Sequence, residues 1–133
     1  MIEEKSCGTI IVDKGKVLLV KQKKSGAFNF PKGHMDDSET EIETAIRETK
    51  EETNLDVEVD SSKRFEMSFI QSEGINKVVV YYIATLNSCC IKKQESEISD
   101  IIWVEIDKVE DLLVFDNLKN LWFNVYNVLK QDK

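Results

Sequence analysis

The sequence predicts an α+β domain in which a single mixed β-sheet lies between α-helices. Short β-branched runs and two long helical segments follow one another in the order strands, helix, strands, helix. The chain has 133 residues, of which 41% are hydrophobic and 32% are charged, a mixture typical of a soluble globular protein. Because this length suits one hydrophobic core, we expect residues 1–133 to form one domain.

The expected strands begin with a β-hairpin. Residues 7–12 and 16–21 are β-branched runs separated by the turn-forming tripeptide Asp13-Lys14-Gly15. Residues 28–37 should start extended, because proline pushes the residue before it out of the helical region, and then continue as a loop. The stretch Val78–Ile83 is almost continuously apolar, which predicts a central strand buried on both faces. The later strands are expected at residues 55–59, 64–71, 77–86 and 101–106.

The first long helix is expected at residues 38–53. Ser38 stands three residues before Glu41, the spacing of a capping box at a helix start. Asn54 stands where the helix should end, and asparagine tolerates the left-handed conformation of a C-terminal cap. The other helices are expected at residues 107–113 and 116–130.

The composition excludes several classes of protein. Lys and Arg number 18 and Asp and Glu 25, so the net charge of −7 lacks the basic surface of a duplex nucleic-acid binder. We expect no membrane span, because no apolar run approaches the ~20 residues that a transmembrane helix needs. The cysteines Cys7, Cys89 and Cys90 lack a CxxC spacing, so we expect reduced thiols in a cytoplasmic protein.

The helix at residues 38–53 carries more carboxylates than stability alone would favour. At about 100° per residue, Glu48, Glu51 and Glu52 form a compact acidic arc beside the buried stripe of the helix. Like charges at this spacing repel one another, and the helix dipole disfavours anions in the last turns. Either the arc is a solvated face, as most charge runs are, or it binds a hard divalent cation such as Mg²⁺ that also engages a phosphate-bearing substrate.

The residues around this helix resemble the signature of the Nudix hydrolases. The pattern runs from Gly33 through Glu39, Arg47-Glu48 and Glu51-Glu52 to Asn54-Leu55, with the spacing of the family and no gap. Thr49 replaces an aliphatic residue of the signature and Asn54 replaces a glycine, but all the charged positions are present. A looser likeness to diadenosine tetraphosphate hydrolases of the animal and archaeal type lies in Cys7-Gly8, residues 28–34, Lys77–Tyr82, Glu97 and Trp103.

The resemblance implies a Nudix fold and a Mg²⁺-dependent enzyme, with Mn²⁺ as a substitute cation. Diadenosine tetraphosphate and related dinucleoside polyphosphates would be hydrolysed to ATP and AMP. The metal would be bound by Glu48, Glu51 and Glu52, with the carbonyl group of Gly33 near it. The expected partner is therefore a small molecule, and we expect a monomer that binds neither duplex nucleic acid nor a membrane.

The resemblance also implies the catalytic residues. Arg47 matches the family arginine that holds a glutamate in place, and Glu51 and Glu52 would take part in catalysis. The general base is either Glu52 or Glu97, and the sequence leaves these alternatives open because such a base must lie within about 3 Å of the attacking water.

Five further residues are expected to bind the substrate. Lys32 and His34 flank Gly33, and an ammonium group and an imidazole can both donate hydrogen bonds to phosphate oxygens. Lys77 could contact a phosphate from the sheet edge. Aromatic rings are needed to stack on adenine, and we expect Phe69 and Tyr81 to do so.

Other functions remain open at this point. A second Nudix activity would act on a different nucleoside diphosphate derivative, such as a nucleoside triphosphate or an RNA 5′ end. A third possibility, from a different class, is a non-catalytic nucleotide-binding module with a Nudix fold. The retained glutamates argue against the binding module.

Overall fold

The computed structural model describes residues 2–87 and 90–131. Cys7 is buried and Cys90 is exposed, and neither forms a disulfide, whereas Cys89 lies outside the described residues. In chain order the elements are β1 (Ile2–Asp13), β2 (Lys16–Gln22), β3 (Phe28–Asn29), β4 (Lys32–His34), α1 (Glu41–Thr53), β5 (Val57–Ser72), β6 (Ile75–Leu86), β7 (Ile98–Glu105), the 3-10 helix η1 (Ile106–Lys108), α2 (Val109–Leu112) and α3 (Asp116–Gln131).

The seven strands in the described part of the chain form one mixed sheet. Its central order is β3-β2-β1-β6-β5, with β4 paired to β1 and β7 paired to β2. β1 and β6 run parallel, so that Ile10 stands opposite Ile83, and the other pairs are antiparallel. The predicted α+β class with a mixed sheet is therefore confirmed, and Val78–Ile83 are buried as expected of a central strand.

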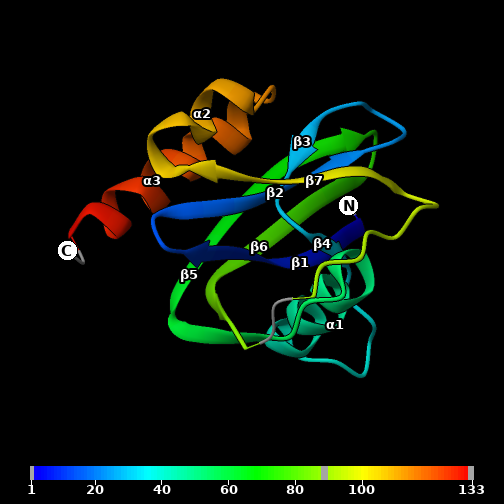
Figure 1. The fold of residues 1–133 in the computed structure, drawn as a ribbon. Helices are drawn as coiled ribbons and strands as arrows, with labels where there is room; N and C mark the ends of the chain where they lie inside the picture. Colours follow the sequence, from blue (N-terminus) through cyan, green and yellow to red (C-terminus); the bar gives the residue numbers. More distant parts are fainter. Residues whose placement is uncertain (1, 88–89, 132–133) are drawn as a thin grey trace.

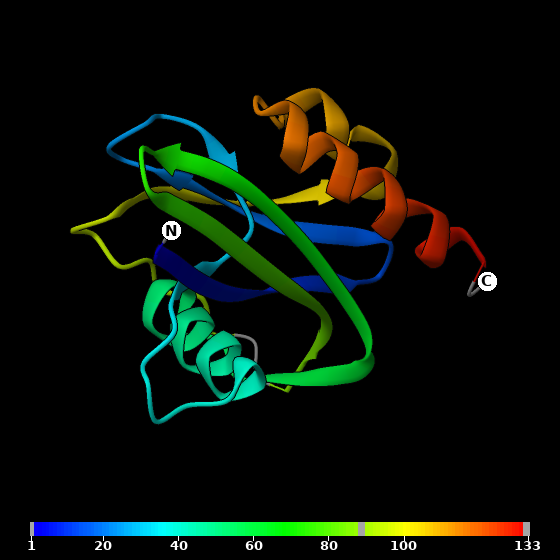
Figure 2. The same ribbon diagram turned by 180° about the vertical axis from the view of Figure 1, so that it is seen from behind.

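Helices cover both faces of this sheet. Figures 1 and 2 show α1 against one face and the pair α2 and α3 against the other. On the α3 face, Trp122 and Val125 pack with Tyr81 in the largest hydrophobic cluster. On the α1 face, Ala45 packs with Tyr82 in a smaller cluster. Successive residues of β6 thus serve opposite layers, as the alternation of a strand requires.

Some predicted strands have different bounds. β1 and β2 pair only through Val12–Val17 and Asp13–Lys16, so the predicted hairpin is short. Residues 32–34, expected in a loop, form β4 and pair with β1 at Ser6–Gly8. The strands expected at 55–59 and 64–71 are the two parts of β5, which is continuous across a register irregularity.

Helix α1 starts two residues later than its capping motif suggested. Thr40, not Ser38, is the N-cap: its hydroxyl accepts from Glu43 N at 3.1 Å, and the Glu43 carboxylate accepts from Thr40 N at 2.8 Å. The sequence contains two overlapping capping-box patterns, and the other one fails because Glu41 turns away to the sheet. The end of the helix is as predicted, since Asn54 adopts a left-handed conformation with φ of 66°.

Glu41 anchors α1 to the sheet through three neighbours. Its carboxylate accepts hydrogen bonds from Lys5 at 2.9 Å, Tyr82 at 2.8 Å, and two nitrogens of Arg64 at 2.8 and 2.9 Å. The hydrogen bonds of Arg64, above all, lower the pKa of Glu41 to about 2. The ionised carboxylate therefore contributes to the attachment of α1.

We expect Glu41→Gln to destabilise the protein by about 1–2 kcal/mol at pH 7, because it leaves Lys5 and Arg64 without their shared anion. The pKa of Glu41 is lower in the folded protein than in the unfolded chain. Its contribution is therefore complete above the unfolded value and is lost as the pH falls from about 5 toward 2. Urea unfolding at pH 7 and pH 3 should show a difference between variant and wild type that shrinks in acid, and an equal difference at both would contradict this role.

Candidate active site

The centre of the site is the contact between α1 and β4. Glu48 and Glu52 lie one turn apart on α1 and both turn toward β4. Lys32 N donates a hydrogen bond to Glu52 Oε1 at 3.2 Å, and the carboxyl group of Glu48 lies over Gly33, where a Cβ atom would collide with it. Glycine at position 33 is thus required for space. Its φ is not positive, so the backbone conformation does not itself require glycine here.

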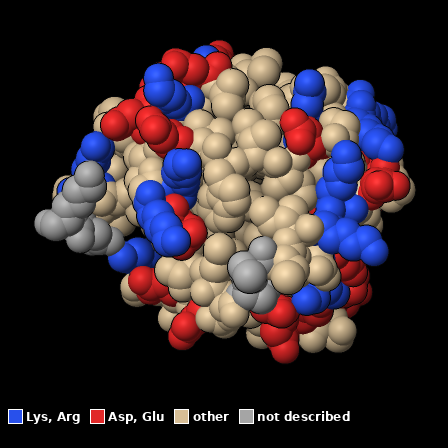
Figure 3. All heavy atoms as spheres, viewed as in Figure 1, with Lys and Arg blue, Asp and Glu red and all other residues tan. Residues whose placement is uncertain are grey.

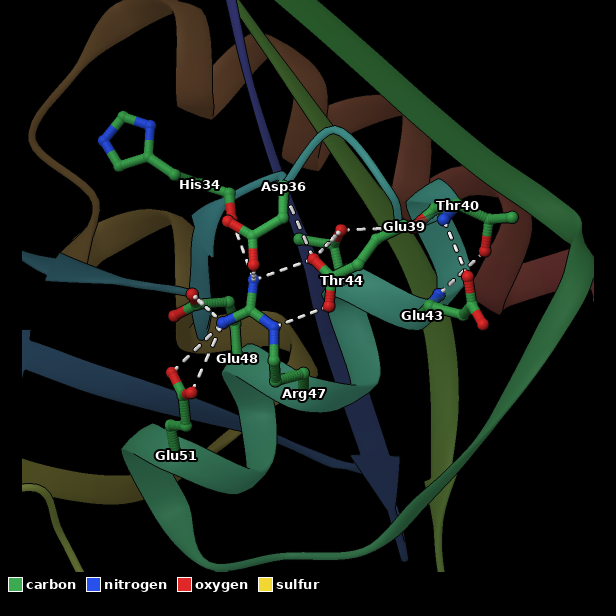
Figure 4. Close-up of polar contacts among 9 residues, drawn as sticks. All are labelled: His34, Asp36, Glu39, Thr40, Glu43, Thr44, Arg47, Glu48 and Glu51. Atoms are coloured by element: carbon green, nitrogen blue, oxygen red, sulfur yellow. Dashed lines mark hydrogen bonds and ion pairs between the residues drawn. The ribbon is translucent and has the colours of Figure 1, made fainter.

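Arg47 connects the carboxylates of this region (Figure 4). Its guanidinium forms a bidentate pair with Glu39 at 2.6 and 2.9 Å. Its Nη1 donates to Glu48 at 2.7 Å and more weakly to Glu51 at 3.3 Å. Its Nη2 donates to the backbone oxygen of His34 at 3.0 Å. Arg47 therefore fixes the end of β4 and orients the glutamates.

The four glutamates of this site have different environments. The pair with Arg47 lowers the pKa of Glu39 to about 2, so Glu39 is the permanent counter-charge of the guanidinium. Glu52 is only 4% exposed, and burial raises its pKa to about 8. Burial also raises the pKa of Glu48, whereas Glu51 is exposed. Burial thus disfavours the ionised form of both Glu48 and Glu52, and of the two only Glu48 has an ion-pair partner, Arg47, among the described residues.

A divalent cation fits this donor set. Carboxylate oxygens are the ligands that Mg²⁺ prefers, and a dication would stabilise the ionised forms of Glu48 and Glu52 that burial disfavours. Yet within residues 2–87 and 90–131 no three His, Cys, Asp or Glu side chains are grouped in a metal-binding arrangement. Glu48 and Glu51 both accept hydrogen bonds from Nη1 of Arg47, whereas Glu52 accepts one from Lys32 N, so the three carboxylates have different partners. Binding of a metal by all three residues stays a proposal.

Beside the carboxylates lies a cavity of about 330 Å³, here called the aromatic cavity. Its lining includes Lys32, Lys77, Phe69 and Phe115. Phe69 and Lys77 are direct cross-strand partners on β5 and β6, which places their side chains on the same face. In the part of the chain that the structure describes, neither ammonium group forms an ion pair, and both lysines have little exposure to water. Burial, together with the charge of Lys77, lowers the pKa of Lys32.

Two of the residues expected to bind the substrate lie elsewhere. Tyr81 is on the same face of β6 as Lys77, but it is 0% exposed beneath α3. Phe30 packs edge-on against its ring at 5.3 Å, and its hydroxyl donates to Asn29 at 2.9 Å. The prediction that Tyr81 stacks on a base is therefore wrong. His34 is exposed and lines a separate acidic cavity, so the structure does not bring it together with Lys32 and Lys77.

Glu97 lies close to the carboxylate pair. It is exposed in the turn before β7, and its charge contributes to the raised pKa of both Glu48 and Glu52. The structure therefore leaves both candidate bases near the site, one buried and one exposed.

Phe115 is an aromatic residue of the cavity that the sequence did not reveal. It is 49% exposed and stands just before α3, far along the chain from Lys32, Phe69 and Lys77. The available signal was a pair of apolar residues, Val114-Phe115, directly before an amphipathic helix, but that signal does not identify a binding role.

A family model described as the NUDIX domain matches residues 5–127 of the chain. The chain belongs to the Nudix family. Thr49, the signature position that departs from the usual aliphatic residue, is buried and shares a hydrogen bond of 2.7 Å with Thr9 of β1, so the added hydroxyl is satisfied. The departure at Asn54 is the left-handed cap described above.

Curated relatives and solved structures support the same assignment. The chain is 28% identical over 130 residues to a rat bis(5′-nucleosyl)-tetraphosphatase (asymmetrical), covering 86% of this chain and 88% of that protein. A Caenorhabditis elegans protein of the same name is 37% identical over 79 residues, covering 58% of this chain and 57% of the relative. A crystal structure of a C. elegans Ap4A hydrolase binary complex superposes with a TM-score of 0.84 at 25% identity, covering 96% of this chain and 98% of the other.

The protein is therefore a Nudix hydrolase with the Nudix fold, and enzymes of this family act on small-molecule substrates. Among the described residues, no helix has the length and apolar character needed to cross a membrane.

We expect Gly33→Ala to lower hydrolase activity about a hundredfold, because displacement of a catalytic group by about 1 Å can cost that much. The new Cβ would push the Glu48 carboxylate, the far end of a flexible side chain, away from β4. Since the backbone at Gly33 suits alanine, the free energy of unfolding in urea should hardly change. Full activity in the variant would show that the position of Glu48 does not matter for the reaction.

Proposed function

We propose that this Nudix hydrolase cleaves diadenosine tetraphosphate and related dinucleoside polyphosphates to ATP and AMP with the help of Mg²⁺. One observation carries the proposal. Lys32 and Lys77, two ammonium groups without ion-pair partners among the described residues, line a cavity with Phe69 and Phe115 directly beside the Glu48–Glu52 pair. This arrangement supplies cations for a phosphate chain, rings for a base and carboxylates for hydrolysis.

The lysines would bind the phosphate chain. Two like charges in a desolvated cavity repel each other, as the lowered pKa of Lys32 indicates. A phosphate anion between them would relieve that repulsion and form charge-assisted hydrogen bonds. Phe69 and Phe115, which are 37% and 49% exposed, would offer the aromatic surface on which an adenine can stack.

The carboxylates would serve the chemical step. A bound Mg²⁺, held by Glu48, Glu51 and Glu52 with the Gly33 carbonyl group nearby, would polarise the phosphoryl group and lower the pKa of a water. Glu52 or Glu97 would accept the proton of the attacking water as the water oxygen bonds to phosphorus. The bridging P–O bond then breaks, and its electron pair stays on the departing phosphate oxygen. Arg47 would keep the glutamates oriented throughout.

The relatives named tetraphosphatases favour this substrate over other nucleoside diphosphate derivatives. The net charge of −7 also disfavours binding of an RNA chain, because its negatively charged backbone would be repelled by the protein. The location in the cytoplasm and the monomeric state remain proposals, as does the extent of the domain over residues 1–133.

The test is product analysis by ion-exchange chromatography after incubation with Mg²⁺. The substrates are diadenosine tetraphosphate, nucleoside triphosphates and a triphosphorylated RNA oligonucleotide. We expect diadenosine tetraphosphate to give ATP and AMP in equal amounts, with EDTA abolishing turnover. The substitution Phe115→Ala should raise the KM for diadenosine tetraphosphate about tenfold, which is the effect of one lost stacking contact, and should change kcat little. Symmetric ADP products, faster cleavage of the other substrates, or binding without turnover would each refute the assignment.

A further inference from the structure

The aromatic cavity has a neighbour of different character. A second cavity of about 580 Å³, here called the lysine cavity, is lined by Gln22, Lys23, Lys24, Ser25, Ser96 and Glu97. Gln22 borders both cavities, so they are adjacent. Among the residues that the structure describes, no aromatic ring lines the lysine cavity, whereas two phenylalanines line the aromatic cavity. The aromatic cavity, on one side of Gln22, is therefore suited to a nucleotide base, and the lysine cavity, on the other side, is suited to a negatively charged group.

The backbone holds the lysine cavity in place. Gln22 N donates to Ala27 O at 3.0 Å and Gly26 N donates to Gln22 O at 2.8 Å, which closes the loop between β2 and β3. Lys23 N donates to Glu97 O at 2.8 Å, which ties this loop to the turn before β7. Gly26 has a φ of 70°, so the tight turn suits glycine. The positions from which the lysine side chains project are thus fixed beside Glu97.

The charges of Lys23 and Lys24 remain available. Both side chains are exposed, and in the described segments 2–87 and 90–131 neither ammonium group forms an ion pair. Figure 3 shows Lys and Arg side chains gathered at the right edge of the molecule, where Figure 1 places the β2–β3 loop and the turn before β7. Glu97 belongs to the lysine cavity and acts electrostatically on Glu48 and Glu52, so the cavity lies next to the carboxylates.

We infer that the enzyme recognises only one base of its substrate, in the aromatic cavity, and that Lys23 and Lys24 bind the far end of the phosphate chain by charge. This inference rests on the proposed function and narrows it to nucleoside 5′-polyphosphates in which a second nucleoside is dispensable. The second base of a dinucleoside polyphosphate would then extend toward solvent and add little binding energy.

The test compares diadenosine tetraphosphate with adenosine 5′-tetraphosphate, which has the same number of phosphates and no second nucleoside. We expect the KM values of the wild-type enzyme for the two compounds to agree within about threefold, since a stacked second base would change KM by about fivefold or more. In Lys23→Ala/Lys24→Ala both KM values should rise about tenfold through the loss of charge-assisted contacts, with kcat nearly unchanged.

The control is Lys16→Ala/Lys108→Ala, which removes the same charge from exposed positions at the start of β2 and in η1. A KM for diadenosine tetraphosphate far below that for adenosine 5′-tetraphosphate would overturn the inference and leave the proposed function standing. So would equal effects of the two double variants, or no effect of Lys23→Ala/Lys24→Ala. If the wild type hydrolyses neither compound in the presence of Mg²⁺, the proposed function itself fails.

Discussion

Glu52→Gln is expected to lower kcat about a thousandfold while the protein stays folded, the size of effect seen when a general base or a metal ligand is removed. The carboxylate is 4% exposed and faces β4, so it lies at the chemical centre of the site. Glutamine has the same shape, and its Oε1 can still accept the hydrogen bond from Lys32 N. The loss would therefore come from the missing charge.

The same variant should be at least as stable as the wild type when metal is absent. Burial raises the pKa of Glu52 to about 8, which means that the folded protein disfavours the ionised form. A neutral glutamine avoids this cost. Thermal melting in EDTA at pH 7.5 and steady-state kinetics with Mg²⁺ measure the two effects, and Glu58→Gln, an exposed position on β5, is the matched control. An unfolded Glu52→Gln, or one with full activity, would refute the role given to this residue.

Gly8→Ala should destabilise the protein by about 3 kcal/mol, at the upper end of the usual cost of overpacking. Gly8 stands opposite Lys32 where β1 meets β4, and an added Cβ would collide with the backbone oxygen of Pro31 and the Cα of Lys32. The same Pro31 oxygen accepts a hydrogen bond from Thr9 N at 3.1 Å. Because these are backbone atoms, β4 itself must move, and the bond from Thr9 is lost.

Urea unfolding measures this effect, and Gly33→Ala provides the comparison. The two variants make the same chemical change on paired strands, but the new methyl group meets backbone at position 8 and the end of a side chain at position 33. Gly8→Ala should therefore lower the stability of the protein, and Gly33→Ala should lower its hydrolase activity. A loss below about 1 kcal/mol in Gly8→Ala would mean that the contact between β1 and β4 relaxes easily.

The parts of the site that follow from local sequence could be predicted. The spacing of Glu48, Glu51 and Glu52 is a property of one helix, and so is the cap at Asn54. Phe69, expected to stack on adenine, and Lys77, expected to contact a phosphate, line the same cavity, and their binding roles stay predictions. The start of α1 was not determined locally, because Lys5 and Arg64 from the sheet decide which capping pattern is used.

The remaining differences come from contacts between distant segments. Tyr81 and Lys77 share a face of β6, and only the position of α3 buries one and leaves the other in a cavity. Phe115 enters that cavity from the segment before α3, and strand alternation cannot reveal such a contact. The pairing of Arg47 with four carboxylates likewise depends on how β4 lies against α1.

Because Nη1 of Arg47 already rests between Glu48 and Glu51, a cation that arrives there replaces an internal one. Binding of the cation would then be an exchange reaction: the guanidinium of Arg47 would lose its contacts with Glu48 and Glu51 and keep its pair with Glu39. The apo protein would be spared the repulsion of bare neighbouring anions, and its apparent affinity for a dication would be weaker than that of the same glutamates without the arginine.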